Sequence, residues 1–313
     1  MSSYYQRGIH KASLFKSMST GTLRNLLDIV RTNKDYVVLL RDDYFNVYYR
    51  GGNVAEVRSD KSVDFDKQYF RQHQDKAKED YDLINEHIAF TKALFKDGRY
   101  NEYMAKVIPA MNHYFELELK GDEEKESQHQ LCISNTYGSS SEFTILDLEY
   151  QVSVRSKFAY CGERRCGKNH DSIPSPRFDI VTVRKSDGKI CIMELKKGTK
   201  ALEGESGLGE HAESFESTVG HSKEKEKLFV EEMRYVLKQM KSLGLIDKRV
   251  SINSDEVEYM VVFQENRKET ETPNQVKVFR DKIKEEFRKY KITKQYQTIE
   301  LHDGDYSLRN NHL

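Results

Sequence analysis

The segment spanning residues 178–197 constrains the fold most, because two apolar runs, FDIVTVR and KICIMELKK, flank the turn Ser186-Asp187-Gly188-Lys189. Asp-Gly between β-branched runs is a strong signal of a two-residue hairpin loop. Apolar residues occupy alternate and intervening positions of both runs, as they do in strands that are covered on both faces. The sequence therefore predicts an antiparallel hairpin inside an α/β sheet with helices on both sides.

Three charged residues interrupt this apolar hairpin. With an Asp187-Gly188 loop, the register places Asp179 opposite Lys196 and Glu194 opposite Val181. Side chains alternate along a strand, so the two carboxylates and the ammonium share one face. Opposed Cβ atoms lie about 5 Å apart, a spacing that suits two carboxylates holding one hard cation beside a lysine.

Burial restricts what these charges can do. A buried carboxylate or ammonium has to be paired or bound to a metal, because its desolvation is otherwise too costly. A metal site satisfies this condition. A structural cluster in which Asp179, Glu194 and Lys196 neutralise one another satisfies it too, and this alternative stays open.

The elements around the hairpin predict two domains. Residues 1–119 form a small α/β domain with a helical connector, in which a helix at 19–32, short strands around Gly51-Gly52 and helices at 76–95 and 102–119 follow one another. Residues 120–313 form a second domain with three strands, an amphipathic helix at 223–243, a fourth strand and a last helix after Pro273. We expect a four-stranded mixed sheet flanked by helices in this second domain.

Charge and hydropathy limit the classes of partner that the chain is expected to bind. The 51 basic side chains balance 51 acidic ones, so no global positive field draws the chain to nucleic acid, and any such binding has to come from local patches. No apolar run has the length of a membrane span, and the amino terminus lacks the apolar stretch of a signal peptide. The cytoplasm is the expected location, without a membrane partner.

The charged residues also fit a known pattern. Pro176-Arg177-Phe178-Asp179, fourteen further residues and Glu194-Leu195-Lys196 resemble the bipartite motif of the PD-(D/E)XK nucleases, the restriction-endonuclease-like superfamily. The proline stands three positions before Asp179 rather than next to it. The resemblance covers about residues 120–265, and the predicted order α-β-β-β-α-β is similar to the core of that superfamily. It implies a restriction-endonuclease-like core behind a small N-terminal α/β domain.

This resemblance implies magnesium-dependent hydrolysis of phosphodiester bonds, in defence or DNA processing. Asp179 and Glu194, helped by the Leu195 carbonyl, would hold Mg²⁺, with Mn²⁺ as a substitute. Lys196 would orient the attacking water or stabilise charge on the phosphorane. Nucleic acid, DNA in preference to RNA, is the implied partner, and a homodimer is left open.

Two further acids are candidates for the catalytic site. In the superfamily an acidic residue from the helix before the sheet often completes the site, and Glu126 has that place here. A solvated helix face in a charged run is the alternative. Glu149, on the first core strand, could reach the metal from the neighbouring strand, or could be an ordinary edge-strand charge.

Basic residues predict where a phosphate backbone would lie. Arg164, Arg165 and Lys168 belong to a loop with a net positive charge, which either contacts phosphates or is simply solvated. His211 is a candidate accessory or phosphate-binding group, or a histidine that satisfies local hydrogen bonds. Beside the nuclease hypothesis there remain an inactive nucleic-acid-binding protein and an assembly protein with a structural Asp/Glu/Lys cluster. The presence of all three motif residues favours the enzyme.

Overall fold

The computed structural model describes residues 6–117, 123–136, 141–152, 176–202, 207–272, 274–292 and 296–308. The chain divides into two compact units. Residues 7–133 and 238–246 form the N-terminal unit, and the other described residues form the C-terminal unit. The basic residues Arg164, Arg165 and Lys168 fall in the range 153–175, outside the described residues. Among the described helices, none is both long enough and apolar enough to cross a bilayer.

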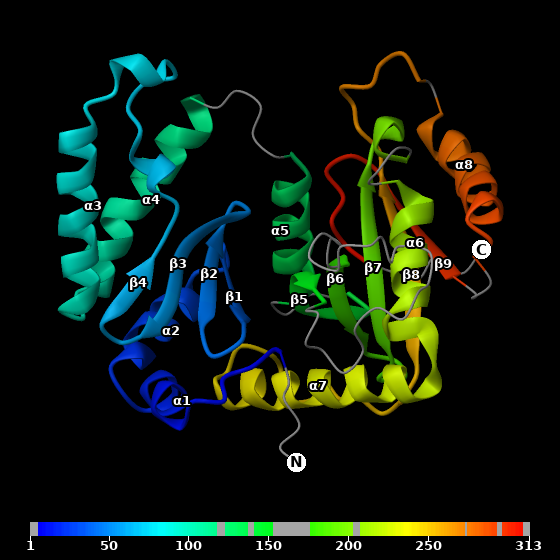
Figure 1. Ribbon diagram of the computed structural model, residues 1–313, viewed down its shortest axis with the longest axis horizontal. Coiled ribbons are helices and arrows are strands. Elements are labelled where there is room, and N and C mark those ends of the chain that lie inside the picture. The colour runs from blue at the N-terminus through cyan, green and yellow to red at the C-terminus, as the bar shows by residue number, and fades with distance from the viewer. Residues whose placement is uncertain are drawn as a thin grey trace, which may run out of the picture. The chain divides into compact units, whose positions relative to one another are not determined.

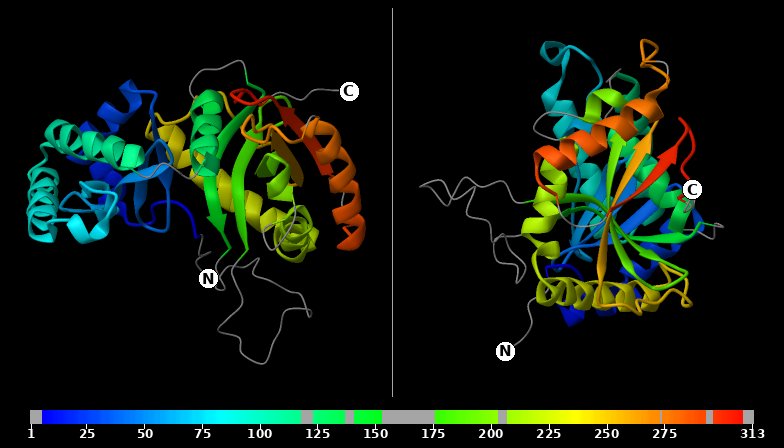
Figure 2. Two further views of the ribbon diagram at one scale, coloured as in Figure 1. Left: turned by 90° about the horizontal axis from the view of Figure 1, so that it is seen from above. Right: turned by 90° about the vertical axis from the view of Figure 1, so that its right-hand side faces the viewer.

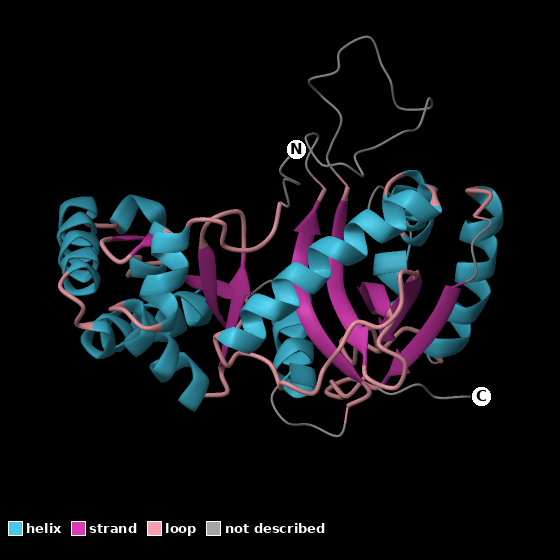
Figure 3. Ribbon diagram, turned by 90° about the horizontal axis from the view of Figure 1, so that it is seen from below, coloured by secondary structure: helices cyan, strands magenta, loops and turns pink. Residues whose placement is uncertain are grey.

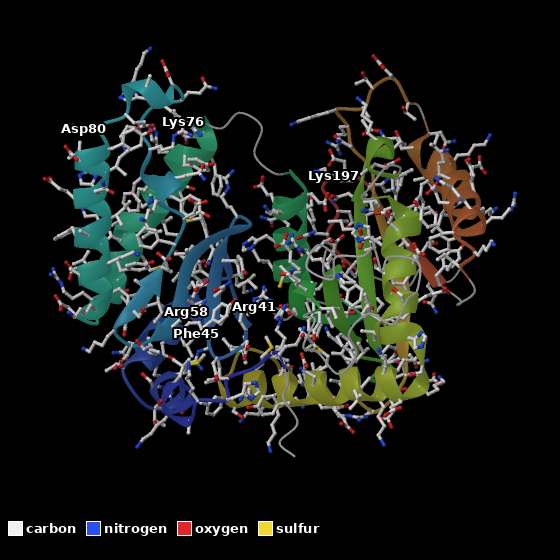
Figure 4. All side chains as sticks on the ribbon, viewed as in Figure 1. Arg41, Phe45, Arg58, Lys76, Asp80 and Lys197 are labelled. Carbon is white, nitrogen blue, oxygen red and sulfur yellow. The ribbon has the colours of Figure 1, made fainter. Side chains whose placement is uncertain are left out.

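The N-terminal unit is built on an antiparallel sheet whose four strands follow in sequence order (Figure 1). Its strands are β1 (Tyr36–Leu40), β2 (Phe45–Tyr49), β3 (Gly52–Ser59) and β4 (Ser62–Asp64). Its helices are α1 (Ala12–Ser19), α2 (Leu23–Thr32), α3 (Tyr81–Lys96) and α4 (Tyr100–Leu117), with the short 3-10 helices η1 (Lys67–Phe70) and η2 (Lys76–Lys78). The side chain of Phe45 is fully buried, whereas Arg58 lies over the ring of Tyr44 at 4.3 Å (Figure 4).

Helix α5 (Glu123–Thr136) belongs largely to this unit, although the expected boundary lay at residue 120. His129 Nε2 lies 2.9 Å from the Asp35 carbonyl oxygen, and Arg50 pairs with Glu126 at 3.5 Å. Gly51 approaches the backbone of Lys125 so closely that a Cβ atom would lie 2.8 Å from it. These contacts join the first turns of α5 to the first sheet, which sequence spacing alone did not indicate.

The C-terminal unit is a mixed sheet with the order β5-β6-β7-β8-β9, flanked by helices (Figure 3). Its strands are β5 (Phe143–Gln151), β6 (Arg177–Arg184), β7 (Ile190–Lys197), β8 (Val257–Gln264) and β9 (Tyr296–Leu301). Strands β5, β6 and β7 pair antiparallel, and β7, β8 and β9 pair parallel. The mixed sheet and its first four strands are confirmed. The fifth strand, residues 296–301, was not predicted, and its burial pattern shows no regular alternation of buried and exposed positions.

Aromatic contacts fix the helices on this sheet, which is visibly twisted in Figure 2. The helices are α6 (Leu208–Ser217), α7 (Lys223–Ser242) and α8 (Gln275–Lys289), with the 3-10 helices η5 (Thr199–Leu202) and η6 (Val219–His221). Phe279 of α8 stacks on Phe263 of β8 with centroids 4.6 Å apart. Phe215 of α6 stacks on Tyr259 of the same strand at 5.2 Å. Tyr259 and Phe263 are four residues apart, so α6 and α8 cover one face of the sheet.

The hairpin between β6 and β7 has a four-residue loop, so the expected two-residue loop and its register were wrong. Ile180 pairs with Met193, and Arg184 N donates to the Lys189 carbonyl at 2.9 Å. The Asp187 carboxylate accepts from Lys189 N and pairs with Arg184, and Gly188 alone adopts a left-handed backbone with φ 71°. The register therefore differs by two positions from the expected one. A shift by two residues preserves the alternation of side chains, so Asp179, Glu194 and Lys196 still share one face of the sheet, as predicted.

We predict that Gly188→Ala lowers the free energy of unfolding by more than about 2 kcal/mol, through left-handed strain plus a steric clash. A Cβ atom there would lie 2.7 Å from Asn253 N and 2.8 Å from the Ser251 carbonyl oxygen. Gly304→Ala is the control, since Gly304 has φ 84° with nothing within 4 Å of a Cβ, and should lose only about 1 kcal/mol. Urea denaturation measures both, and equal losses would show that this loop does not fix the hairpin as described.

Candidate active site

The structure brings the three motif residues together on adjacent strands. Asp179 lies on β6, and Glu194 and Lys196 lie on β7. One position beyond the Ile180 and Met193 pair, the register places Asp179 opposite Glu194 rather than opposite Lys196. Lys196 is two residues from Glu194 and points to the same face.

Hydrogen bonds organise this cluster around Glu194. Lys196 Nζ donates to Glu194 Oε1 at 2.6 Å, and His211 Nδ1 of α6 lies 2.9 Å from Glu194 Oε2. The backbone N–H of Leu195 donates to Asp179 Oδ2 at 2.9 Å. The exposed fractions are only 1% for Glu194, 3% for Lys196 and 6% for Asp179. The cluster is thus a desolvated set of charges in which each contact is electrostatically strong.

The charge state of Glu194 follows from this environment. Burial raises the pKa of the Glu194 carboxyl. The charge of Lys196 and the hydrogen bond from His211 lower this pKa by more than burial raises it, so it lies below the ordinary value. Glu194 is therefore ionised at neutral pH and presents two acceptor oxygens, as a cation ligand must.

Glu149 stands beside Asp179 in an unusual backbone conformation. Leu148 pairs with Ile180 and Tyr150 pairs with Phe178, so the position between them faces Asp179. Glu149 has φ 49° in the left-handed region, and its carboxylate lies 3.9 Å from Arg177 Nη1. The structure thus places Glu149 next to the cluster, with a side chain that contacts Arg177.

Two other candidates have partners that the sequence did not indicate. Glu126 pairs with Arg50 within the N-terminal unit. His211, expected to bind phosphate or to be structural, contacts the Glu194 carboxylate. A glycine-rich segment precedes His211 in the sequence, but nothing in it indicates that α6 brings the histidine onto β7.

The donor set determines which cation could bind. Carboxylate and carbonyl oxygens are ligands of hard cations, and Mg²⁺ typically takes one or two carboxylates and keeps several waters. Asp179, Glu194 and the Leu195 carbonyl fit this chemistry. Within the described ranges, no group of three or more His, Cys, Asp or Glu side chains is arranged to hold a metal ion.

Comparison of the chain with protein-family models, with curated proteins and with solved structures finds no match.

Replacement of Lys196 tests how strongly the cluster depends on its ammonium. Lys196→Met should lower the free energy of unfolding in metal-free buffer by about 3–5 kcal/mol, because it leaves a buried carboxylate without its cationic partner. Lys197→Met is the matched control, since the neighbouring Lys197 pairs with Asp303 at 3.8 Å near the end of β7 (Figure 4), and should lose less than about 1 kcal/mol. If urea denaturation showed similar losses of unfolding free energy for both variants, the buried pair of Lys196 and Glu194 would contribute no more to stability than the pair of Lys197 and Asp303.

Proposed function

We propose that this protein is a magnesium-dependent nuclease of the PD-(D/E)XK type that hydrolyses phosphodiester bonds in nucleic acid, DNA in preference to RNA. The observation that carries the proposal is the convergence of Asp179, Glu194 and Lys196 on one face of adjacent buried strands. The elements α5, β5, β6, β7, α7 and β8 follow one another in the order of the α-β-β-β-α-β core of that superfamily, with α6 inserted between β7 and α7 and with most of α5 in the N-terminal unit. The preference for DNA comes with the resemblance to the superfamily.

Each residue of the cluster has a role in this proposal. Asp179, Glu194 and the Leu195 carbonyl would hold Mg²⁺, which when bound polarises the phosphate and lowers the pKa of water. The Leu195 N–H fixes one oxygen of Asp179, and His211 fixes one oxygen of Glu194. Such partners orient the ligands before the ion arrives. Lys196 would leave Glu194 and direct its ammonium to the attacking water or to the charged phosphate oxygens.

Cleavage assays test the activity itself. The parent should cut plasmid, linear or single-stranded DNA, or RNA, with Mg²⁺ or Mn²⁺ and not with EDTA. Asp179→Asn should reduce cleavage at least about a hundred-fold, in line with the loss of one preorganised charged group. It should keep the fold, because an amide oxygen can still accept from Leu195 N.

Asp303→Asn serves as a control for the removal of an acid in the same unit, since Asp303 pairs with Lys197 and Arg267 away from the cluster. Its cleavage rate should stay within about two-fold of the parent rate, as expected for a group outside the site. Absence of cleavage by the parent on every substrate and with both cations would reject the nuclease.

A structural ion-pair cluster is the second candidate, and one observation favours it. Lys196 and His211 contact both oxygens of Glu194, so its charge is already compensated by protein groups. Buried clusters of this kind can serve conformational specificity without any catalysis.

Thermal unfolding with and without Mg²⁺ separates the two candidates. If the cluster is a cation site, Mg²⁺ raises the melting temperature of the parent by mass action. The rise should be larger for Lys196→Met, because no ammonium then competes for Glu194. A purely structural cluster predicts no response to Mg²⁺ in either protein.

A further inference from the structure

Tyr259 of β8 has a buried hydroxyl group that takes no part in the proposed function. The residue is only 3% exposed, and its hydroxyl oxygen has no hydrogen-bond partner in the structure. A buried hydroxyl without a partner destabilises the fold, and a phenylalanine would fill the same space without that cost. Phe263, four residues further along the same strand, shows that the sheet accommodates an aromatic ring without a hydroxyl here.

The register of β7 and β8 places Tyr259 beside the cluster. Tyr259 pairs with Ile192, and Val261 pairs with Glu194, so the tyrosine lies one step along the same face from that carboxylate. Its ring stacks on Phe215 of α6, the helix that also carries His211. The packing of one helix thus sets the positions of the tyrosine ring and of a partner of Glu194.

Electrostatics keep the tyrosine hydroxyl a hydrogen-bond donor. Burial raises the pKa of Tyr259 well above its ordinary value, and the negative charges of Glu194 and Asp179 raise it further. The hydroxyl is therefore protonated at neutral pH. A protonated donor near two carboxylates stabilises their negative charge once it can form a bond to them.

In the structure the two carboxylates contact other groups. Glu194 Oε1 is occupied by Lys196, Glu194 Oε2 by His211, and Asp179 Oδ2 by Leu195 N. If Lys196 left Glu194 in favour of a bound divalent cation, Glu194 would lose the hydrogen bond of Lys196, and a further donor to the carboxylate pair would replace it.

We infer that Tyr259 is a positioning residue of the cation site, whose hydroxyl donates to the carboxylate pair of Asp179 and Glu194, directly or through one water, when Lys196 is displaced. This inference rests on the cation-binding part of the proposed function and not on the nature of the substrate. It assigns a donor on the fourth strand to a site otherwise formed by β6, β7 and α6.

Calorimetric titration with Mg²⁺ of the parent, Tyr259→Phe and a control tests the inference. Tyr259→Phe should melt at the same temperature as the parent or higher in EDTA, because it removes a buried hydroxyl without a partner. It should bind Mg²⁺ about ten-fold more weakly, the effect expected for one hydrogen bond to a charged group. Tyr100→Phe, which removes another buried hydroxyl in the N-terminal unit, should bind Mg²⁺ as the parent does.

A cleavage readout distinguishes positioning from a structural role. The Mg²⁺ concentration for half-maximal cleavage should rise about ten-fold in Tyr259→Phe, while the rate at saturating Mg²⁺ stays close to the parent rate. Equal Mg²⁺ affinity in Tyr259→Phe and parent would overturn the inference alone and assign the hydroxyl to a resident water. No Mg²⁺ binding by the parent would overturn both the inference and the proposed function, whereas Mg²⁺ binding without cleavage would overturn the nuclease alone.

Discussion

The hydrogen-bonded ion pair between Lys196 and Glu194 is the interaction on which the C-terminal unit depends. Both side chains are buried at the centre of a five-stranded sheet, where an uncompensated charge would be strongly destabilising. The two residues lie two positions apart on β7, and His211 of α6 contacts the second oxygen of Glu194. The positions, the burial and the ionised state of Glu194 and Lys196 therefore depend on one another.

If the site binds a divalent cation as proposed, that cation has to compete with the ammonium of Lys196 for Glu194. In the resting arrangement the ammonium of Lys196 occupies Glu194, and a divalent ion would have to compete with it. The apparent affinity of the site for the ion is then lower than the affinity of the carboxylates without Lys196. The factor is the preference of Glu194 for its ion pair with Lys196 over the unpaired state. Under the proposed function, the ion pair between Lys196 and Glu194 would persist at low concentrations of the free ion and give way at high ones.

Much of this arrangement could be predicted from the sequence, and the failures have physical causes. The alternation of side chains placed Asp179, Glu194 and Lys196 on one face, a result that survives a register shift of two. The loop length was missed because the Asp187 carboxylate accepts from Lys189 N and pairs with Arg184. The Asp-Gly pair alone does not reveal these local contacts. His211 and Tyr259 were missed as neighbours of Glu194, because a helix and a parallel strand bring them from distant parts of the chain. The place of α5 was missed because its charged surface carries no clear apolar stripe.

The irregular course of β5 has a consequence for association between copies of the chain. This strand ends the order of its sheet, and end strands offer unpaired backbone groups to which another strand can add. The register shift between Ile145 and Asp147 and the left-handed conformation of Glu149 break the straight ladder that such addition requires. Edge-to-edge growth of the sheet along β5 is thereby discouraged.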